Sequence, residues 1–178
     1  MTPSDKGLDA WLIRVVPRAV AYARTLLGRP DRAEDVVQDV LCRLLDHPEY
    51  DLLRDGEKLL FRSITNACIN EATRRRQMLS LDERTGDGDA LLDALDAASP
   101  GDPATVAASR DLMAAVEREL GDLPSMQRAA LELKAMGMPL ARVAEALDVT
   151  ASNAGVLVHR ARKQLRARLG PILPGEFR

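Results

Sequence analysis

The chain has 178 residues, of which 46% are hydrophobic and only 3% aromatic, so any core must be built mainly from leucine, valine and alanine. No run of about 18 uncharged apolar residues and no signal-peptide pattern is present, which predicts a cytoplasmic protein without membrane insertion. A net charge of −2 argues against indiscriminate binding to DNA.

The first two predicted elements are helices. Apolar residues at helical spacing predict a helix over 8–27, which Pro17 should kink or split. Asp31, with Glu34 three residues later, is a plausible N-cap of a second helix that ends near Leu45. No segment has the alternation typical of a strand, so we expect an all-α fold.

A loop and a long helix complete an N-terminal helical domain, expected over residues 1–79. Pro48 and Gly56 mark residues 47–57 as a loop. The helix that follows, over 58–77, ends on three arginines, which suit the negative end of a helix dipole.

Residues 80–103 have the composition of a flexible linker that joins two small helical domains. From Asp82 to Pro103 the sequence has seven acidic residues and one arginine, interspersed with glycine and proline. The second domain is then expected over 104–178.

The second domain ends in a helix-turn-helix pattern. Helices are expected to Leu120 and through Met136, followed by a short helix that Pro139 opens. After a tight turn, Thr150 or Ser152 caps the last helix. The inward stripe of that helix is expected to be Ala154, Val158, Ala161 and Leu165.

The outward face of the last helix suits nucleic acid. Asparagine can read adenine, arginine and lysine can bind guanine or phosphate, and valine can contact a thymine methyl group. Its second half is strongly basic while its first half is neutral, so it suits holding phosphates more than reading many bases. The outward positions are Ser152, Asn153, Gly155, Val156, His159, Arg160 and Lys163.

Other chemistry is not indicated. Cys42 and Cys68 lie in apolar helical patterns and are expected to be small buried hydrophobic residues. The two histidines have no metal-ligand spacing, and no phosphate loop or nucleophile motif occurs. We therefore expect no metal, no cofactor and no enzymatic site.

Three segments resemble the bacterial sigma factors of the extracytoplasmic-function (ECF) group, in that family's regions 2 and 4. They are AYARTLLGRPDRAEDVVQDVLCRLL, LLFRSITNACINEATRRR and LPSMQRAALELKAMGMPLARVAEALDVTASNAGVLVHRARKQL. The resemblance implies a transcription initiation factor that binds core RNA polymerase and directs it to promoters. Specificity would then be shared by the two domains.

The resemblance also implies roles for individual residues. Asp35, Gln38 and Asp39, which alone would be an ordinary solvated helix face, match the surface that docks on the polymerase. Recognition and melting of single-stranded −10 DNA falls to the long third helix and the 50–57 loop before it. The residues implied for that helix are Asn66 for a flipped base and Arg62, Arg74, Arg75 and Arg76 for the backbone. The outward face of the last helix would bind the −35 duplex.

The chain departs from the family pattern in that last helix, where Gly155 and Val156 replace a basic residue and a serine. This departure favours an alternative, in which a sigma-like regulatory module uses region 4 mainly to bind a protein such as an anti-sigma factor. A stand-alone helix-turn-helix repressor is a third interpretation, and it leaves the first domain without a role.

An anti-sigma factor is an expected partner in the leading interpretation too. As a further hypothesis, packing of the two domains on each other hides Asp35 and Gln38 and so keeps the protein inactive.

Overall fold

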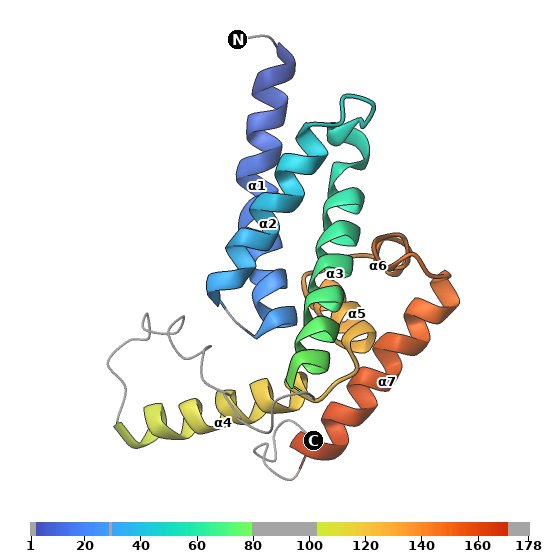
Figure 1. Cartoon of the computed structure of the whole chain (residues 1–178). Coiled ribbons are helices and arrows are strands. Elements are labelled where there is room, and N and C mark those ends of the chain that lie inside the picture. The colour runs from blue at the N-terminus through green and yellow to red at the C-terminus, as the bar shows by residue number, and fades with distance from the viewer. Residues whose placement is uncertain (1–2, 29, 80–102, 171–178) are drawn as a thin grey trace.

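The computed structural model describes residues 3–28, 30–79 and 103–170, and every regular element in these ranges is an α-helix (Figure 1). The all-α prediction is therefore confirmed. The predicted acidic linker lies outside the described residues except for Pro103, where the fourth helix begins. The helices are α1 (Pro3–Leu27), α2 (Pro30–Leu45), α3 (Leu52–Leu79), α4 (Pro103–Gly121), α5 (Ser125–Ala135), α6 (Leu140–Leu147) and α7 (Ala151–Leu169).

Helices α1, α2 and α3 pack side by side around a buried aromatic pair (Figure 1). The rings of Tyr22 and Phe61 meet edge to face, with centroids 5.3 Å apart. The Tyr22 hydroxyl lies 2.7 Å from Oγ1 of Thr65, which donates in turn to the Phe61 carbonyl. This chain satisfies a polar group that burial would otherwise leave without a partner.

The structure differs from two expectations about helix boundaries in this region. Pro17 lies inside α1 and does not split it, and the flanking residues Val15 and Ala19 are buried in the core. Asp31 lies in the first turn of α2, which begins at Pro30, and so does not precede the helix as an N-cap.

The loop expected over 47–57 is shorter than its glycine and proline suggested. Helix α3 begins at Leu52, where the carboxylate of Asp51 accepts a hydrogen bond from the backbone N–H of Arg54 at 3.1 Å. Gly56 is a buried helical residue, because the Trp11 ring of α1 lies directly against it. A contact between α1 and α3 therefore accounts for a glycine that the sequence alone presents as a turn signal.

The helix-turn-helix is present as expected. Thr150 caps α7, with its Oγ1 accepting from the Asn153 N–H at 3.2 Å. In the turn, Asp148 adopts a left-handed conformation with φ 55°. Of the expected inward stripe of α7, Ala154, Val158 and Ala161 are buried and Leu165 is half-buried.

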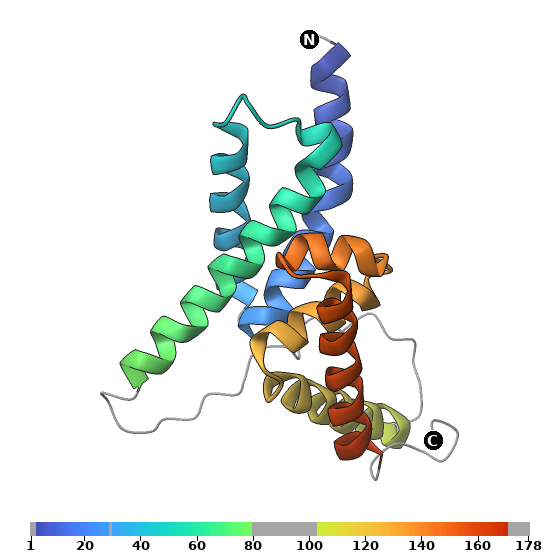
Figure 2. The same ribbon diagram turned by 90° about the vertical axis from the view of Figure 1, so that its right-hand side faces the viewer.

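The two groups of helices pack on each other: α6 lies against α3 and α5 against α1 (Figure 2). One apolar core runs from α1–α3 into α5–α7. At its edge, Nη1 of Arg128 donates to the carbonyls of Thr25 and Leu26, the last turn of α1, at 3.3 Å each. We call this packing the closed arrangement. The division into domains at residues 1–79 and 104–178 stays a prediction.

Two glycines inside helices should respond in opposite ways to alanine. A Cβ at Gly56 would lie 2.8 Å from Cζ2 of Trp11, whereas one at Gly155 would lie 3.5 Å from Cδ2 of Leu140, an ordinary contact. We expect Gly56→Ala to lower the free energy of unfolding by about 1–3 kcal/mol. Gly155→Ala should raise it by about 0.5–1 kcal/mol, because alanine favours the helix.

Chemical denaturation followed by the fluorescence of Trp11, the single tryptophan of the chain, measures both changes. Equal stability of Gly56→Ala and the wild type would contradict the assigned contact.

Candidate nucleic-acid interface

Helix α2 presents a polar face to solvent. Its opposite side is buried through Ala33, Val36, Val37, Val40 and Leu44, which leaves Asp35, Gln38 and Asp39 together on the exposed side. Their ion pairs are long and lie within the helix: 3.6 Å from Asp35 to Arg32 and 4.0 Å from Asp39 to Arg43. Exposed pairs of this kind contribute little, so both carboxylates remain available to a partner.

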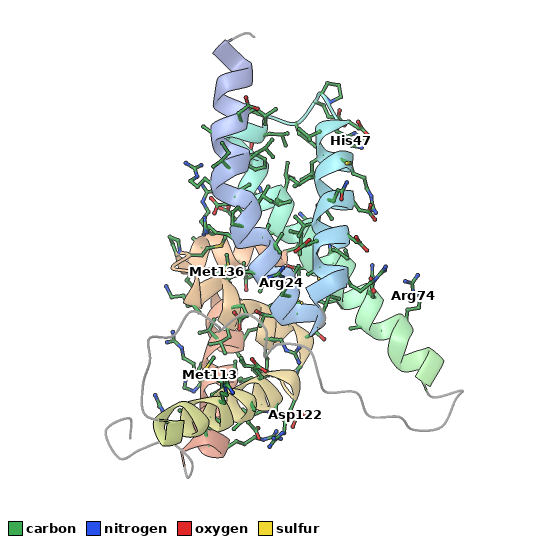
Figure 3. All side chains as sticks on the ribbon, turned by 90° about the vertical axis from the view of Figure 1, so that its left-hand side faces the viewer. Arg24, His47, Arg74, Met113, Asp122 and Met136 are labelled. Atoms are coloured by element: carbon green, nitrogen blue, oxygen red, sulfur yellow. The ribbon has the colours of Figure 1, made fainter. Side chains whose placement is uncertain are left out.

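The polar face borders a shallow groove between α2 and α3. Arg32 crosses it and donates from Nε to Oε1 of Glu71 at 3.1 Å, which fixes α2 beside α3. Figure 3 looks onto α2, with His47 beyond its C-terminal end and Arg74 standing out from α3. Arg32, Arg43 and Glu71 were missed in the sequence, although the first two lie three or four residues from the predicted ones. The groove is lined by Arg32, Asp35, Val36, Gln38, Asp39, Val40, Arg43, Ala67, Glu71 and Arg74.

The closed arrangement does not hide this face. Asp35, Gln38 and Asp39 are all exposed, although α5 and α6 pack against the first three helices. The hypothesis that packing buries Asp35 and Gln38 is therefore wrong. The contacts of the second group of helices are with α1 and α3, not with the outward side of α2.

Helix α3 carries the residues expected to bind −10 DNA. Arg62 and Asn66 lie one turn apart, and Asn66 is exposed and makes no side-chain hydrogen bond to a described residue. Arg62 is half-buried, and its Nη2 donates to the Asp148 carboxylate at 2.6 Å. Arg74 is exposed two turns beyond Asn66. The side chains of Arg75 and Arg76 lie outside the described part of the structure.

Helix α7 presents six of its seven expected residues to solvent. Ser152, Asn153, Val156, His159, Arg160 and Lys163 are exposed. Gly155 is half-buried below Leu140 of α6, which the sequence interpretation did not include. Leu140 and Val156 are both exposed, so the N-terminal part of the face is apolar.

The C-terminal part of α7 divides its basic residues between two uses. His159, Arg162, Lys163 and Arg166 line a shallow concave surface, and none of these forms an ion pair with a described residue. Arg168, in contrast, pairs with Glu119 at 2.9 Å and with Asp122 at 2.8 Å. These contacts raise its pKa and fasten α7 to the end of α4. The basic end therefore divides into an exposed concave surface and one residue that supports the fold.

Two family models match the chain. Sigma-70 region 2 matches residues 12–78, and Sigma-70, region 4 matches residues 113–165. Together they account for more than half of the sequence. The chain belongs to the sigma-70 family. It is thus related to transcription initiation factors with a DNA-binding region 4.

A solved sigma factor has a similar fold. It is RpoE in complex with the anti-sigma factor NepR from Bartonella quintana, with a TM-score of 0.69 and 21% sequence identity. The match covers 93% of this chain and 98% of that chain. At this identity the similarity is evidence of a shared fold. No curated protein sequence matches the chain.

The predicted site residues all fall inside the two sigma-70 matches. Region 2 spans α2 and most of α3, and region 4 ends within α7. Among the described residues no group of His, Cys, Asp and Glu side chains could hold a metal ion. None of the described helices has a stretch long and apolar enough to span a membrane.

The two cysteines of this sigma-70 family member differ, contrary to expectation. Cys68 is buried, but Cys42 is exposed on α2, seven residues after Asp35 and so on the same polar face. Burial raises the pKa of the Cys68 thiol to about 12, with a smaller contribution from Glu71. Its apolar flanks did not reveal that position 42 lies on the solvent side of the helix.

A thiol reagent should therefore modify Cys42 alone in the folded protein. We expect one thiol to react rapidly with dithionitrobenzoate at pH 8 and the second only in denaturant, because the thiolate is the reactive form and Cys68 is both buried and protonated. Cys42→Ser should abolish the rapid reaction. Two rapid equivalents would contradict the assigned burial.

Proposed function

We propose that this protein is a sigma factor of the ECF type that acts in the cytoplasm, where it binds core RNA polymerase and directs it to promoters. One observation carries the proposal: α2, α3 and α7 each bury an apolar stripe and leave exposed all but two, Arg62 and Gly155, of the described residues that the family resemblance singles out. The two Sigma-70 matches support it, because they cover all three faces.

Core polymerase binds the polar face of α2 in this proposal. Two carboxylates and one amide, Asp35, Asp39 and Gln38, meet basic and polar groups on a partner helix. Because the three side chains lie on a rigid helix and have only weak internal pairs, little reorganisation accompanies docking.

Single-stranded −10 DNA binds along α3. The exposed amide of Asn66 bonds to the edge of an extruded base, and Arg62 and Arg74 hold the backbone. Arg75 and Arg76 add two more positive charges to the sequence at the C-terminal end of α3. Duplex −35 DNA binds α7, with Arg160 and Lys163 on phosphates and Asn153 and Val156 toward the bases.

A second candidate function, a module whose region 4 binds a protein, is favoured by the exposed apolar pair Leu140 and Val156. An anti-sigma factor is the kind of partner that we infer for either function. The similar fold of RpoE, which was solved with NepR, supports that inference.

Removal of the α2 polar groups should abolish polymerase binding. For Asp35→Ala/Gln38→Ala we expect affinity for core polymerase to fall by about 30-fold or more, since central interface residues each contribute more than 1 kcal/mol. Binding to labelled core enzyme measures this, followed by transcription from a genomic promoter pool.

Asp9→Ala, an exposed acid on α1, is the control and should bind as the wild type does. If the folded wild type shows no affinity for core polymerase, the sigma-factor proposal is wrong, and a protein partner of α7 becomes the better explanation.

Val156 should contact a thymine methyl group in the −35 duplex. After a preferred duplex is selected from a randomised pool, replacing its thymines one at a time with uracil removes single methyl groups. One replacement should cost the wild type about 0.8 kcal/mol, or about fourfold in affinity. Val156→Ala should bind the thymine and uracil duplexes with equal affinity.

Competition binding with labelled duplex measures the effect. Arg160→Ala is the matched control: it should weaken binding to every duplex and keep the preference for thymine. A protein that binds no duplex but captures an anti-sigma factor through Val156 would support the second candidate function.

A further inference from the structure

An ion pair joins α3, the helix proposed to bind −10 DNA, to the turn of the helix-turn-helix. Nη2 of Arg62 lies 2.6 Å from Oδ2 of Asp148, although the two residues are 86 positions apart in the chain. The Arg62 side chain is 41% exposed and that of Asp148 is 66% exposed, so both remain accessible to ions and polymers in solution. This contact therefore sits at the rim of the closed arrangement, where a competitor can reach it.

Asp148 stands in a backbone conformation that few residues other than glycine, asparagine and aspartate adopt. The residue ends α6 in the left-handed region, with φ 55° and ψ 46°, where glycine or asparagine is usual. Aspartate tolerates this conformation better than most residues but has no helix-capping need to be charged there. Its carboxylate points to α3 and binds Arg62.

The pair does not hold the two groups of helices together by itself. An ion pair as exposed as this one adds little to stability. The apolar packing of α6 on α3 and the Arg128 contacts with the end of α1 supply the larger part. The effect of the pair is instead on Arg62: its guanidinium already binds the Asp148 carboxylate and is not free to bind another anion.

The closed arrangement treats the proposed binding faces differently. Arg62 is engaged by Asp148, whereas Asp35, Gln38 and Asp39 on α2 are exposed. Six of the seven expected outward residues of α7 are exposed as well. Polymerase docking and −35 contacts are thus open in the closed arrangement, and the −10 contact of Arg62 is not.

We propose that Asp148 masks the −10 site, its carboxylate taking the place of a backbone phosphate of single-stranded DNA on Arg62. The protein then docks on polymerase in the closed arrangement, and Arg62 engages the −10 strand only when α6 leaves α3. This inference rests on the proposed function. Since both anions compete for one guanidinium, single-stranded DNA favours opening, and closing weakens DNA binding by the same factor.

The test compares two single substitutions that change the net charge equally. Asp148→Asn removes the masking carboxylate and keeps a residue suited to the left-handed conformation. Glu145→Gln removes a carboxylate of α6 that pairs with Arg142 of the same helix and not with α3. Any difference between them cannot come from net charge.

Binding of a fluorescent single-stranded −10 oligonucleotide, selected from a randomised pool, is measured on the free full-length protein. We expect Asp148→Asn to bind about fivefold or more tightly than Glu145→Gln, which should resemble the wild type. Adding Arg62→Ala to Asp148→Asn should remove the gain. Equal affinities for the two single substitutions would overturn the mask.

A distance measurement gives a second, independent result. Dyes on Cys42 of α2 and on a cysteine introduced at Ala167 of α7, both exposed, report opening by energy transfer. Energy transfer should fall on adding the oligonucleotide, and Asp148→Asn should need less oligonucleotide for the same fall than Glu145→Gln. Unchanged transfer on adding the oligonucleotide would also overturn the mask.

Binding of each variant to core polymerase separates this inference from the proposed function. Normal polymerase binding by the wild type and Asp148→Asn, with no difference in oligonucleotide affinity, rejects the mask alone. A wild type that binds neither polymerase nor oligonucleotide rejects both.

Discussion

Tyr22 lies where α1, α3 and α5 meet, and the placement of α3, which carries one of the proposed binding faces, depends on this junction. Its ring packs on Phe61 and its hydroxyl on Thr65, which fixes α1 against α3. Burial raises the pKa of Tyr22 well above its usual range, and nearby Glu132 of α5 contributes to the shift in the same direction. The phenol therefore stays neutral, as a hydroxyl that is buried in an apolar core must.

The buried stripes of α2 and α3 decide which sides of these two helices remain available. With few aromatic residues, the core is closed by small side chains such as Ala19, Ala33 and Val37, so the helices approach closely and each uses only one narrow stripe. The remaining sides of α2 and α3 carry the charged and amide groups. Rigid helices hold these groups in place before any partner arrives, which lowers the entropy lost on binding.

The sequence predicted what depends on local periodicity. The stripes of α2 and α7 and the cap at Thr150 follow from spacing and side-chain chemistry, and they place Asp35, Gln38 and six of the seven expected outward residues of α7 in solvent, as predicted. It did not predict what depends on contacts between distant residues. Gly56 is helical because Trp11 lies against it, and Arg168 belongs partly to α4 through Glu119. No local pattern encodes either partner.

The same distinction explains the two-part character of α7 and the pairing of Arg62. The basic end of α7 is divided between free residues that suit phosphate and one arginine that supports the fold. Its neutral beginning is backed by Leu140 rather than by charge. Arg62 was expected to face DNA and instead meets an aspartate of the opposite group of helices. Charges that bind an acidic polymer also attract the acids of their own chain, so a basic residue near the packing of two groups of helices, such as Arg62, can meet an internal carboxylate before it meets a phosphate.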